Sequence, residues 1–102
     1  ITYANRGEVY RQQGESENAI ADFNKAIELD PTDAIAYSDR GVVYFAQDEF
    51  EKAITDFTKA IELDPANAVN YYYRGVTLEE LGSTENAEAD YAKAKELGYE
   101  PE

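Results

Sequence analysis

Residues 35–68 read IAYSDRGVVYFAQDEFEKAITDFTKAIELDPANA, and residues 1–34 read ITYANRGEVYRQQGESENAIADFNKAIELDPTDA, so 21 of the 34 aligned positions are identical. Residues 69–102 form a more divergent copy, with 11 identities to the second block and 13 to the first. Three blocks of 34 residues therefore account for all 102 residues of the chain. A fixed period of this length is typical of architectures in which each repeat packs mainly against its neighbours.

Each block is predicted to fold as two helices of about a dozen residues, because its small and aromatic residues are spaced three and four apart. In the second block the first helix carries Tyr37, Gly41 and Tyr44 on one face. The second helix carries a matching set, which is Ala53, Phe57 and Ala60. Gly and Ala at facing positions let two antiparallel helices approach closely, and an aromatic ring one turn away fills the space beside them.

The boundaries of the second helix also have sequence signals. Asp48 with Glu51 predicts a capping box at its start. Pro65 predicts its end, because proline cannot continue the backbone hydrogen-bond ladder.

The order of these residues resembles the repeat pattern of the tetratricopeptide repeat family over the whole chain. The second block matches it at Tyr37, Gly41, Tyr44, Ala53, Phe57, Ala60 and Pro65, and the first block matches as fully. The third departs at Leu78 and has Tyr99 where proline is expected. The resemblance implies an all-α, right-handed α-solenoid of three helix-turn-helix repeats, hence six helices, with repeats at 1–34, 35–68 and 69–102 of a single domain spanning 1–102. It also implies that the first helices line a concave groove, in a scaffold that binds proteins or peptides and is not itself catalytic.

The composition excludes several classes of chemistry. The chain has no His and no Cys, so it lacks the residues of Ser-His and Cys-His nucleophile pairs and of thiolate metal sites. Nine Lys+Arg against 22 Asp+Glu give a net charge of −13, which disfavours binding to nucleic acid. No apolar run approaches the ~20 residues of a membrane span. We therefore expect no enzyme activity, no cofactor, no metal site, no nucleic-acid or membrane partner, and a soluble chain for which a cytoplasmic location is favoured.

The ends of the chain give two further expectations. Ile1 already lies inside an amphipathic pattern, so we expect the sequence to be a segment of a longer chain. In the third block Glu88 and Lys95 replace isoleucines of the earlier blocks, which predicts a solvated C-terminal cap on which no further repeat packs. Gly98 is predicted to cap the last helix before Pro101.

An arginine precedes the central glycine in each block, and an aspartate follows that arginine by 16 residues. We predict one Arg–Asp ion pair within each hairpin. We also predict a contact between each aspartate and the lysine three positions later. The residues concerned are Arg6, Asp22 and Lys25, then Arg40, Asp56 and Lys59, then Arg74, Asp90 and Lys93. A row of arginines that binds a ligand is the alternative.

The opposite face of the first helices is predicted to form the partner-binding groove. Tyr72 and Tyr73 replace small or polar residues at the equivalent positions of the other blocks, so the fold does not require their bulk. Large side chains exposed on a concave wall are typical anchors for a partner. The alternative is that they only thicken the packing between repeats. The candidate groove residues are Ile35, Ser38, Asp39, Val42, Phe45, Val69, Tyr72, Tyr73, Val76 and Glu79.

The charge of this groove indicates the chemistry of its partner. A known subclass of the family grips the acidic C-terminal tails of chaperones through Lys, Arg and Asn, whereas this chain offers Arg11 as its only basic groove candidate. We therefore expect a peptide or helix with apolar anchors and flanking Lys or Arg, steered by Glu8, Asp39, Glu79 and Glu80 and bound by a monomer. The alternative is an assembly element whose exposed N-terminal repeat end, bordered by Ile1, Thr2 and Val9, stacks on other repeats of the same parent chain or of another copy, with weak self-association in the second case.

Overall fold

The computed structural model describes residues 2–100, and every regular element in that range is an α-helix. The predictions made for Ile1 and Pro101 lie outside the described residues. The helices, of 10 to 14 residues each, are α1 (Tyr3–Gln12), α2 (Ser16–Leu29), α3 (Ala34–Ala46), α4 (Phe50–Leu63), α5 (Ala68–Glu80) and α6 (Thr84–Glu96). The predicted all-α fold with two helices in each block is confirmed.

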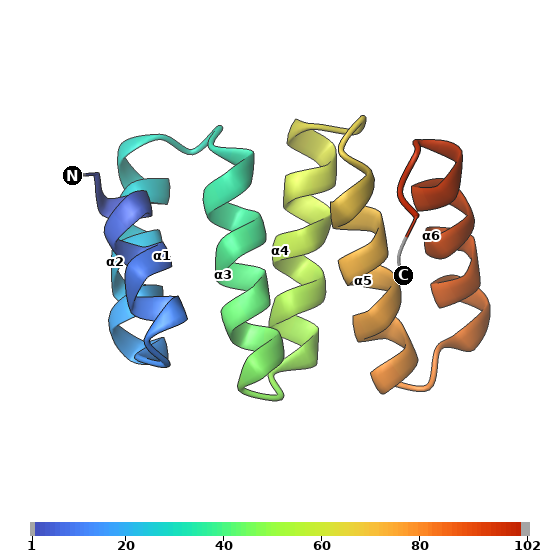
Figure 1. The fold of residues 1–102 in the computed structure, drawn as a ribbon, viewed down its shortest axis with the longest axis horizontal. Helices are drawn as coiled ribbons and strands as arrows, with labels where there is room; N and C mark the ends of the chain where they lie inside the picture. Colours follow the sequence, from blue (N-terminus) through green and yellow to red (C-terminus); the bar gives the residue numbers. More distant parts are fainter. Residues whose placement is uncertain (1, 101–102) are drawn as a thin grey trace.

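The three hairpins follow one another in chain order along the 37 Å long axis of the molecule, and α1 lies in front of α2 in this view (Figure 1). Each helix packs on the one that follows it. In addition α1 contacts α3 and α3 contacts α5, whereas within residues 2–100 the second helices α2, α4 and α6 do not contact one another. The first helices are therefore closer together than the second helices, and they form the inner layer of a stack of helical hairpins.

The close approach of the two helices in each hairpin depends on glycine. A Cβ atom added to Gly41 would lie only 2.8 Å from Cε1 of Phe57, whose side chain is buried on α4. The same arrangement recurs between Gly7 and Phe23, and between Gly75 and Tyr91. Because the aromatic ring occupies the space that a side chain would need, the small–aromatic pattern of the sequence sets the spacing of the helices.

Adjacent hairpins share a core. Val43 of α3 packs with Ala19 and Phe23 of α2, and Ile20 covers this cluster from the side. Ile20 thus lies at the cluster that joins the two repeats, and its predicted contact with the next repeat stays a prediction. At the equivalent place on α6, Glu88 is exposed, and so is Lys95, two turns further along the same face of the helix. Charge thus lies where the earlier repeats place isoleucine.

The predicted capping box at Asp48 is wrong. The residue at the start of α4 is Glu49, which makes no side-chain capping hydrogen bond. Asp48 instead has a φ of 63°, and its N–H donates to the carbonyl of Phe45 at 3.0 Å, closing the C-terminal end of α3. The first and third repeats place Gly14 and Gly82 at this left-handed position. Asp48 is therefore a turn residue in a conformation that favours glycine.

Replacing Asp48 with glycine is expected to raise the free energy of unfolding by about 0.5 to 1 kcal/mol, because glycine adopts a positive φ without steric cost. The matched control is Gly14→Asp, which is expected to lower stability by a similar amount at the equivalent turn. Urea denaturation followed by circular dichroism measures both changes. A stability loss in Asp48→Gly would contradict this account.

The chain ends differently from the turns between repeats. Gly98 follows the helix-capping residue Leu97 with a φ of 102°, and the N–H of Tyr99 donates to the carbonyl of Ala94 at 2.9 Å. These bonds form a Schellman motif, which confirms the predicted role of Gly98. The segment after α6 consequently turns back toward α5 (Figure 1).

Candidate functional site

The three predicted Arg–Asp pairs are present. Each guanidinium donates two parallel hydrogen bonds to both oxygens of its aspartate, with nitrogen-to-oxygen distances of 2.8 and 2.9 Å for Arg6, 2.9 and 2.7 Å for Arg40, and 2.7 and 2.8 Å for Arg74. The partner aspartates are buried. Because an unpaired buried carboxylate is costly, these arginines contribute to the fold of each hairpin.

The predicted contact of each aspartate with a lysine three residues later is wrong. Lys25 pairs with Glu28 at 3.5 Å, and Lys59 and Lys93 pair in the same way with the next glutamate along the helix. The reason is that both aspartate oxygens are already occupied by the arginine in the interior. The lysine side chain, which lies toward solvent, takes the nearest exposed carboxylate instead.

Two of the arginines also bridge repeats, which was not predicted. Arg40 donates from Nη1 to Oδ1 of Asn24 at 2.8 Å, and Arg74 donates from Nη1 to Oγ1 of Thr58 at 3.2 Å. Both acceptors belong to the second helix of the preceding repeat. The sequence does contain a signal for this bridge. The position is polar in the two blocks that another block follows, whereas its equivalent in the last block is Ala92, which has no polar side chain.

An apolar pocket of about 270 Å³ lies on the first-helix side, between α3 and α5. Five of the predicted groove residues line it, namely Val42, Phe45, Tyr72, Tyr73 and Val76. Phe57 and Thr77 complete the lining and were not predicted, because the repeat pattern assigns Phe57 to the core of the hairpin. The ring centroid of Phe57 lies 5.6 Å from that of Tyr73. This aromatic contact therefore joins the core of the second hairpin to the wall of the pocket.

A smaller, more polar pocket of about 200 Å³ lies beside it, at the beginning of α3 and α5. It contains the predicted residues Ile35, Ser38, Asp39, Val69 and Tyr73, together with Ala34, Asn67 and Asn70. Tyr73 lines both pockets and is 36% exposed. The hydroxyl of Ser38 donates to Oδ1 of the buried Asn70 at 2.6 Å, so Ser38 connects α3 to α5.

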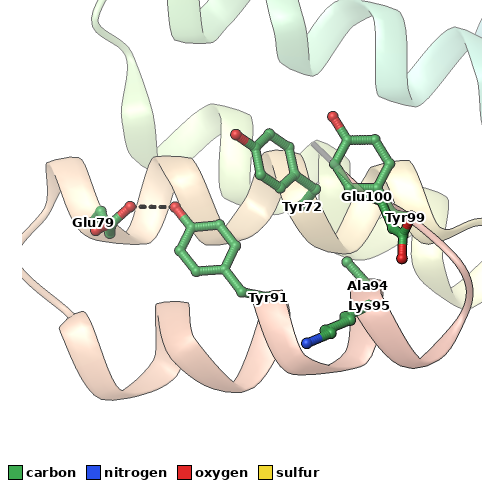
Figure 2. Close-up of a pocket in the computed structure, with 7 residues that line it drawn as sticks. All are labelled: Tyr72, Glu79, Tyr91, Ala94, Lys95, Tyr99 and Glu100. Carbon is green, nitrogen blue, oxygen red and sulfur yellow. Dashed lines mark hydrogen bonds between the residues drawn. The ribbon is translucent and has the colours of Figure 1, made fainter. Parts of the chain in front are cut away.

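A third pocket of about 730 Å³ opens between α5, α6 and the C-terminal segment (Figure 2). Tyr72 lines this pocket together with Tyr91 and Tyr99, whose ring centroids lie 5.5 Å and 4.6 Å from that of Tyr72. The hydroxyl of Tyr91 donates to the carboxylate of Glu79. Burial and this hydrogen bond raise the pKa of Tyr91 above its usual range. Tyr72 therefore packs within the third repeat as well as lining the groove.

The ten predicted groove residues all line at least one of these three pockets. Their role in binding a partner remains a prediction. No helix within residues 2–100 combines the length and the apolar character that crossing a bilayer requires. In the same range, no three acidic side chains are gathered as metal ligands would be.

The electrostatics of the smaller pocket centre on Asp39. Its side chain is half-buried, and burial together with the nearby charge of Glu8 raises the pKa of Asp39 to about 6. Arg11 offsets this effect only in part, because it donates two hydrogen bonds to Glu8 and lowers the pKa of that carboxyl. The pocket therefore holds a carboxylate that is poorly stabilised within the protein.

The raised pKa makes Asp39 a destabilising charge at neutral pH. Between its ordinary value of 3.8 and about 6 the folded state holds a proton that the unfolded state has lost, so the free energy of unfolding is expected to rise as the pH falls from 7 toward 4. The lowered pKa values of Glu8 and Asp22 act in the opposite direction, but only below about pH 4.5.

Asp39→Asn is accordingly expected to raise the free energy of unfolding at pH 7 by about 1 kcal/mol, a value reduced for the partial exposure of the side chain. It is also expected to flatten the pH dependence between pH 5 and 7. Urea denaturation at pH 5, 6 and 7 measures both effects. Glu17→Gln, at an exposed position on α2, is the control, and an unchanged stability of Asp39→Asn at pH 7 would contradict the prediction.

Stacked helical hairpins with an inner groove define the class of repeat-built interaction scaffolds. Family models described as "TPR repeat" and "Tetratricopeptide repeat" match residues 7–48, 34–67 and 57–89. The chain belongs to the tetratricopeptide repeat family, as its sequence pattern predicts. The members of this family are known as interaction modules that lack catalytic activity.

Solved structures agree with this assignment. The first TPR of Spaghetti (RPAP3) bound to HSP90 peptide SRMEEVD superposes with a TM-score of 0.92 at 28% identity, over 94% of this chain and 76% of that one. The second TPR of the same protein, bound to the same peptide, gives 0.91 at 27% identity, over 93% and 88%. A crystal structure of MamA gives 0.91 at 30% identity, over 93% and 56%. No individual curated protein sequence matches the chain.

Proposed function

We propose that this chain is a non-catalytic, monomeric scaffold module that binds an apolar peptide segment flanked by lysine or arginine in the groove along α1, α3 and α5. The observation that carries the proposal is the apolar pocket between α3 and α5. It is open to solvent on the inner side, and Phe45, Tyr72 and Tyr73 supply aromatic surface of the kind that anchors partners at interfaces.

The charges around the pocket support a basic partner. Asp39 and Glu79 line the flanking pockets, and the one basic candidate, Arg11, is paired with Glu8. The chain as a whole has a net charge of −13. Such a field attracts cationic ligands and raises their rate of association, an effect that weakens as salt is added.

The two similar structures of Spaghetti support peptide binding in general but carry a peptide of the opposite kind. SRMEEVD contains three acidic residues and one arginine. The two pockets between α3 and α5 contain Asp39 and no lysine or arginine, and the nearby Arg11 is already paired with Glu8, so this part of the groove has no free cation to receive those carboxylates. We therefore infer that this chain selects for the reverse charge.

Fluorescence anisotropy with three labelled peptides tests the proposal. The first probe has two leucines between pairs of lysines, the second replaces both leucines with serine, and the third is SRMEEVD. The first is expected to bind most tightly. Phe45→Ala and Tyr72→Ala are each expected to cost about 1 to 3 kcal/mol of binding free energy to the first probe if they act as anchors.

Leu29→Ala serves as the matched control, because Leu29 is an exposed apolar residue at the end of α2 and lies outside the three pockets. Circular dichroism verifies that the variants remain folded. Tighter binding of SRMEEVD than of the lysine-flanked probe, or unchanged affinity in both groove variants, would refute the proposal.

A second function, self-association through the N-terminal end, is favoured by one observation. Tyr3 and Val9 on α1 are 40% and 45% exposed, although both are large and apolar. Light scattering over a concentration series separates the two functions. A mass that grows with concentration and is reduced by Val9→Ser supports assembly, whereas a constant monomer mass excludes it.

A further inference from the structure

The smaller groove pocket contains one acidic side chain that has no partner. Its other polar side chains are occupied elsewhere, since Ser38 and Asn70 bond to each other and Asn67 accepts from the N–H of Val69 at the start of α5. Among residues 2–100, by contrast, the carboxylate of Asp39 accepts no hydrogen bond and forms no ion pair. A half-buried carboxylate without a donor is unfavourable unless a ligand supplies one.

The groups that face Asp39 make a cation the fitting ligand. Glu8 and Arg11 of α1 and Asp33 at the start of α3 contribute to its electrostatic environment, and Arg11 is bound to Glu8 through both guanidinium hydrogen bonds. Together these four groups carry three negative charges and one positive charge. The carboxylate of Asp33 also caps α3 by accepting from the N–H of Ala36 at 3.1 Å. Asp39 is therefore the group left to receive a positive charge.

Tyr73 connects this carboxylate to the apolar pocket. Its side chain lines both pockets, with Asp39 in one of them and Phe45 in the other. A tyrosine ring also attracts cations at its face. If one side chain of a bound peptide occupies the apolar pocket, a neighbouring residue of that peptide would lie beside Tyr73, in the pocket that contains Asp39.

Comparison of the repeats separates this arrangement from the requirements of the fold. Asp39 corresponds to Asn5 in the first repeat and to Tyr73 in the third, so the same helical position accepts a neutral amide, an acid and an aromatic ring. The acid occurs only in the middle repeat, next to the aromatic residue of the third. The pair Asp39 and Tyr73 arises where those two repeats meet.

We propose that Asp39 and Tyr73 form a subsite for one lysine or arginine side chain of the peptide bound in the adjacent apolar pocket. This proposal rests on the proposed function and sharpens it, because it assigns the basic flank of the peptide to the pocket at the beginning of α3 and α5. The bound peptide then has one orientation, with its apolar anchor beside the later turns of α3 and α5 and its cation toward the beginning of these helices.

The subsite also makes binding depend on pH. Burial and Glu8 raise the pKa of Asp39 to about 6, so the side chain is charged at pH 7.5 and largely neutral at pH 5. Of the other facing groups, Arg11 keeps its charge in this range, and the lowered pKa of Glu8 keeps that carboxyl ionised. Loss of the Asp39 charge is therefore expected to weaken binding of the cationic peptide as the pH falls.

The experiment uses the lysine-flanked probe and two versions of it, each with the lysines of one flank acetylated. Acetylation of one flank is expected to lower affinity on the order of fivefold, and acetylation of the other by much less. Asp39→Asn is expected to weaken the unmodified probe on the order of fivefold and to abolish the difference between the flanks. Asp39→Asn is also expected to remove most of the decrease in affinity that the unaltered chain shows between pH 7.5 and pH 5.

Glu17→Gln, which removes the same charge from the exposed side of α2, controls for the field of the whole chain and is expected to change affinity less than twofold. Equal effects of Asp39→Asn and Glu17→Gln, or equal sensitivity of both flanks, would overturn the subsite while leaving groove binding in place. Failure of the unmodified probe to bind the unaltered chain would overturn both proposals. Asp39→Asn is expected to fold, because it removes a destabilising charge.

Discussion

Phe57→Ala is expected to lower the free energy of unfolding by about 3 to 5 kcal/mol, because it removes the largest buried ring of the middle hairpin. Phe57 is 1% exposed, and its ring fills the space beside Gly41 that brings α3 and α4 together. It also contacts Tyr73 of the next repeat. The cavity left by alanine therefore loosens both the hairpin and its junction with the third repeat.

The matched control is Phe45→Ala, which deletes the same ring at a half-buried position on α3. It is expected to lower stability by about 1 to 2 kcal/mol, since less apolar surface returns to water. Thermal and urea denaturation measure both variants. Equal losses at the two positions would contradict the assignment of Phe57 to the core and Phe45 to the open pocket.

Arg40→Leu is expected to lower the free energy of unfolding by about 3 kcal/mol, because it leaves the carboxylate of Asp56 buried without its partner. The side chain of Asp56 is 3% exposed, and that of Arg40 is 20% exposed. The substitution also removes the hydrogen bond from Arg40 to Asn24 that joins the first two repeats. Affinity for the lysine-flanked probe is expected to be unchanged, because Arg40 lines none of the groove pockets.

Two further variants isolate the cause. Arg6→Leu removes the equivalent pair where the arginine is 48% exposed and, among the described residues, donates to Asp22 alone, so a smaller loss is expected. The double variant Arg40→Leu with Asp56→Leu removes both charges and is expected to recover most of the stability. If the double variant is as unstable as Arg40→Leu alone, the unpaired carboxylate is not the cause. A loss of binding at unchanged stability would instead favour the arginine row as a ligand site.

Features that depend on the repeat period could be predicted from the sequence. The number of helices follows from it, and so does the pairing of each arginine with an aspartate 16 residues away, because every copy repeats the same residues at the same places. The groove face was assigned by the same projection. Its ten residues line the pockets, but which of them contact a partner is a separate matter that the binding experiments decide.

Features that depend on competition between neighbouring groups could not be predicted. Asp48 has the residue type of a helix cap, but the turn after α3 needs a left-handed residue and uses this one. Lys25 has the spacing for Asp22, but Arg6 already occupies both oxygens of that carboxylate. The stacking of Tyr99 on Tyr72 depends on the direction of a single turn, which the repeat pattern does not specify.

The absence of contacts among α2, α4 and α6 within the described chain has a consequence for internal motion. The first hairpin contacts the rest of the described chain only at α3, so its undocking would expose Val43 and break the hydrogen bond from Arg40 to Asn24 but would leave the junction of the second and third hairpins in place. The apolar pocket lies between α3 and α5 and would survive such an opening, whereas Glu8 and Arg11 would move away from Asp39. The proposed binding of apolar side chains therefore depends on the junction of the second and third hairpins, whereas the electrostatic environment of the proposed acidic subsite depends also on the docking of the first hairpin.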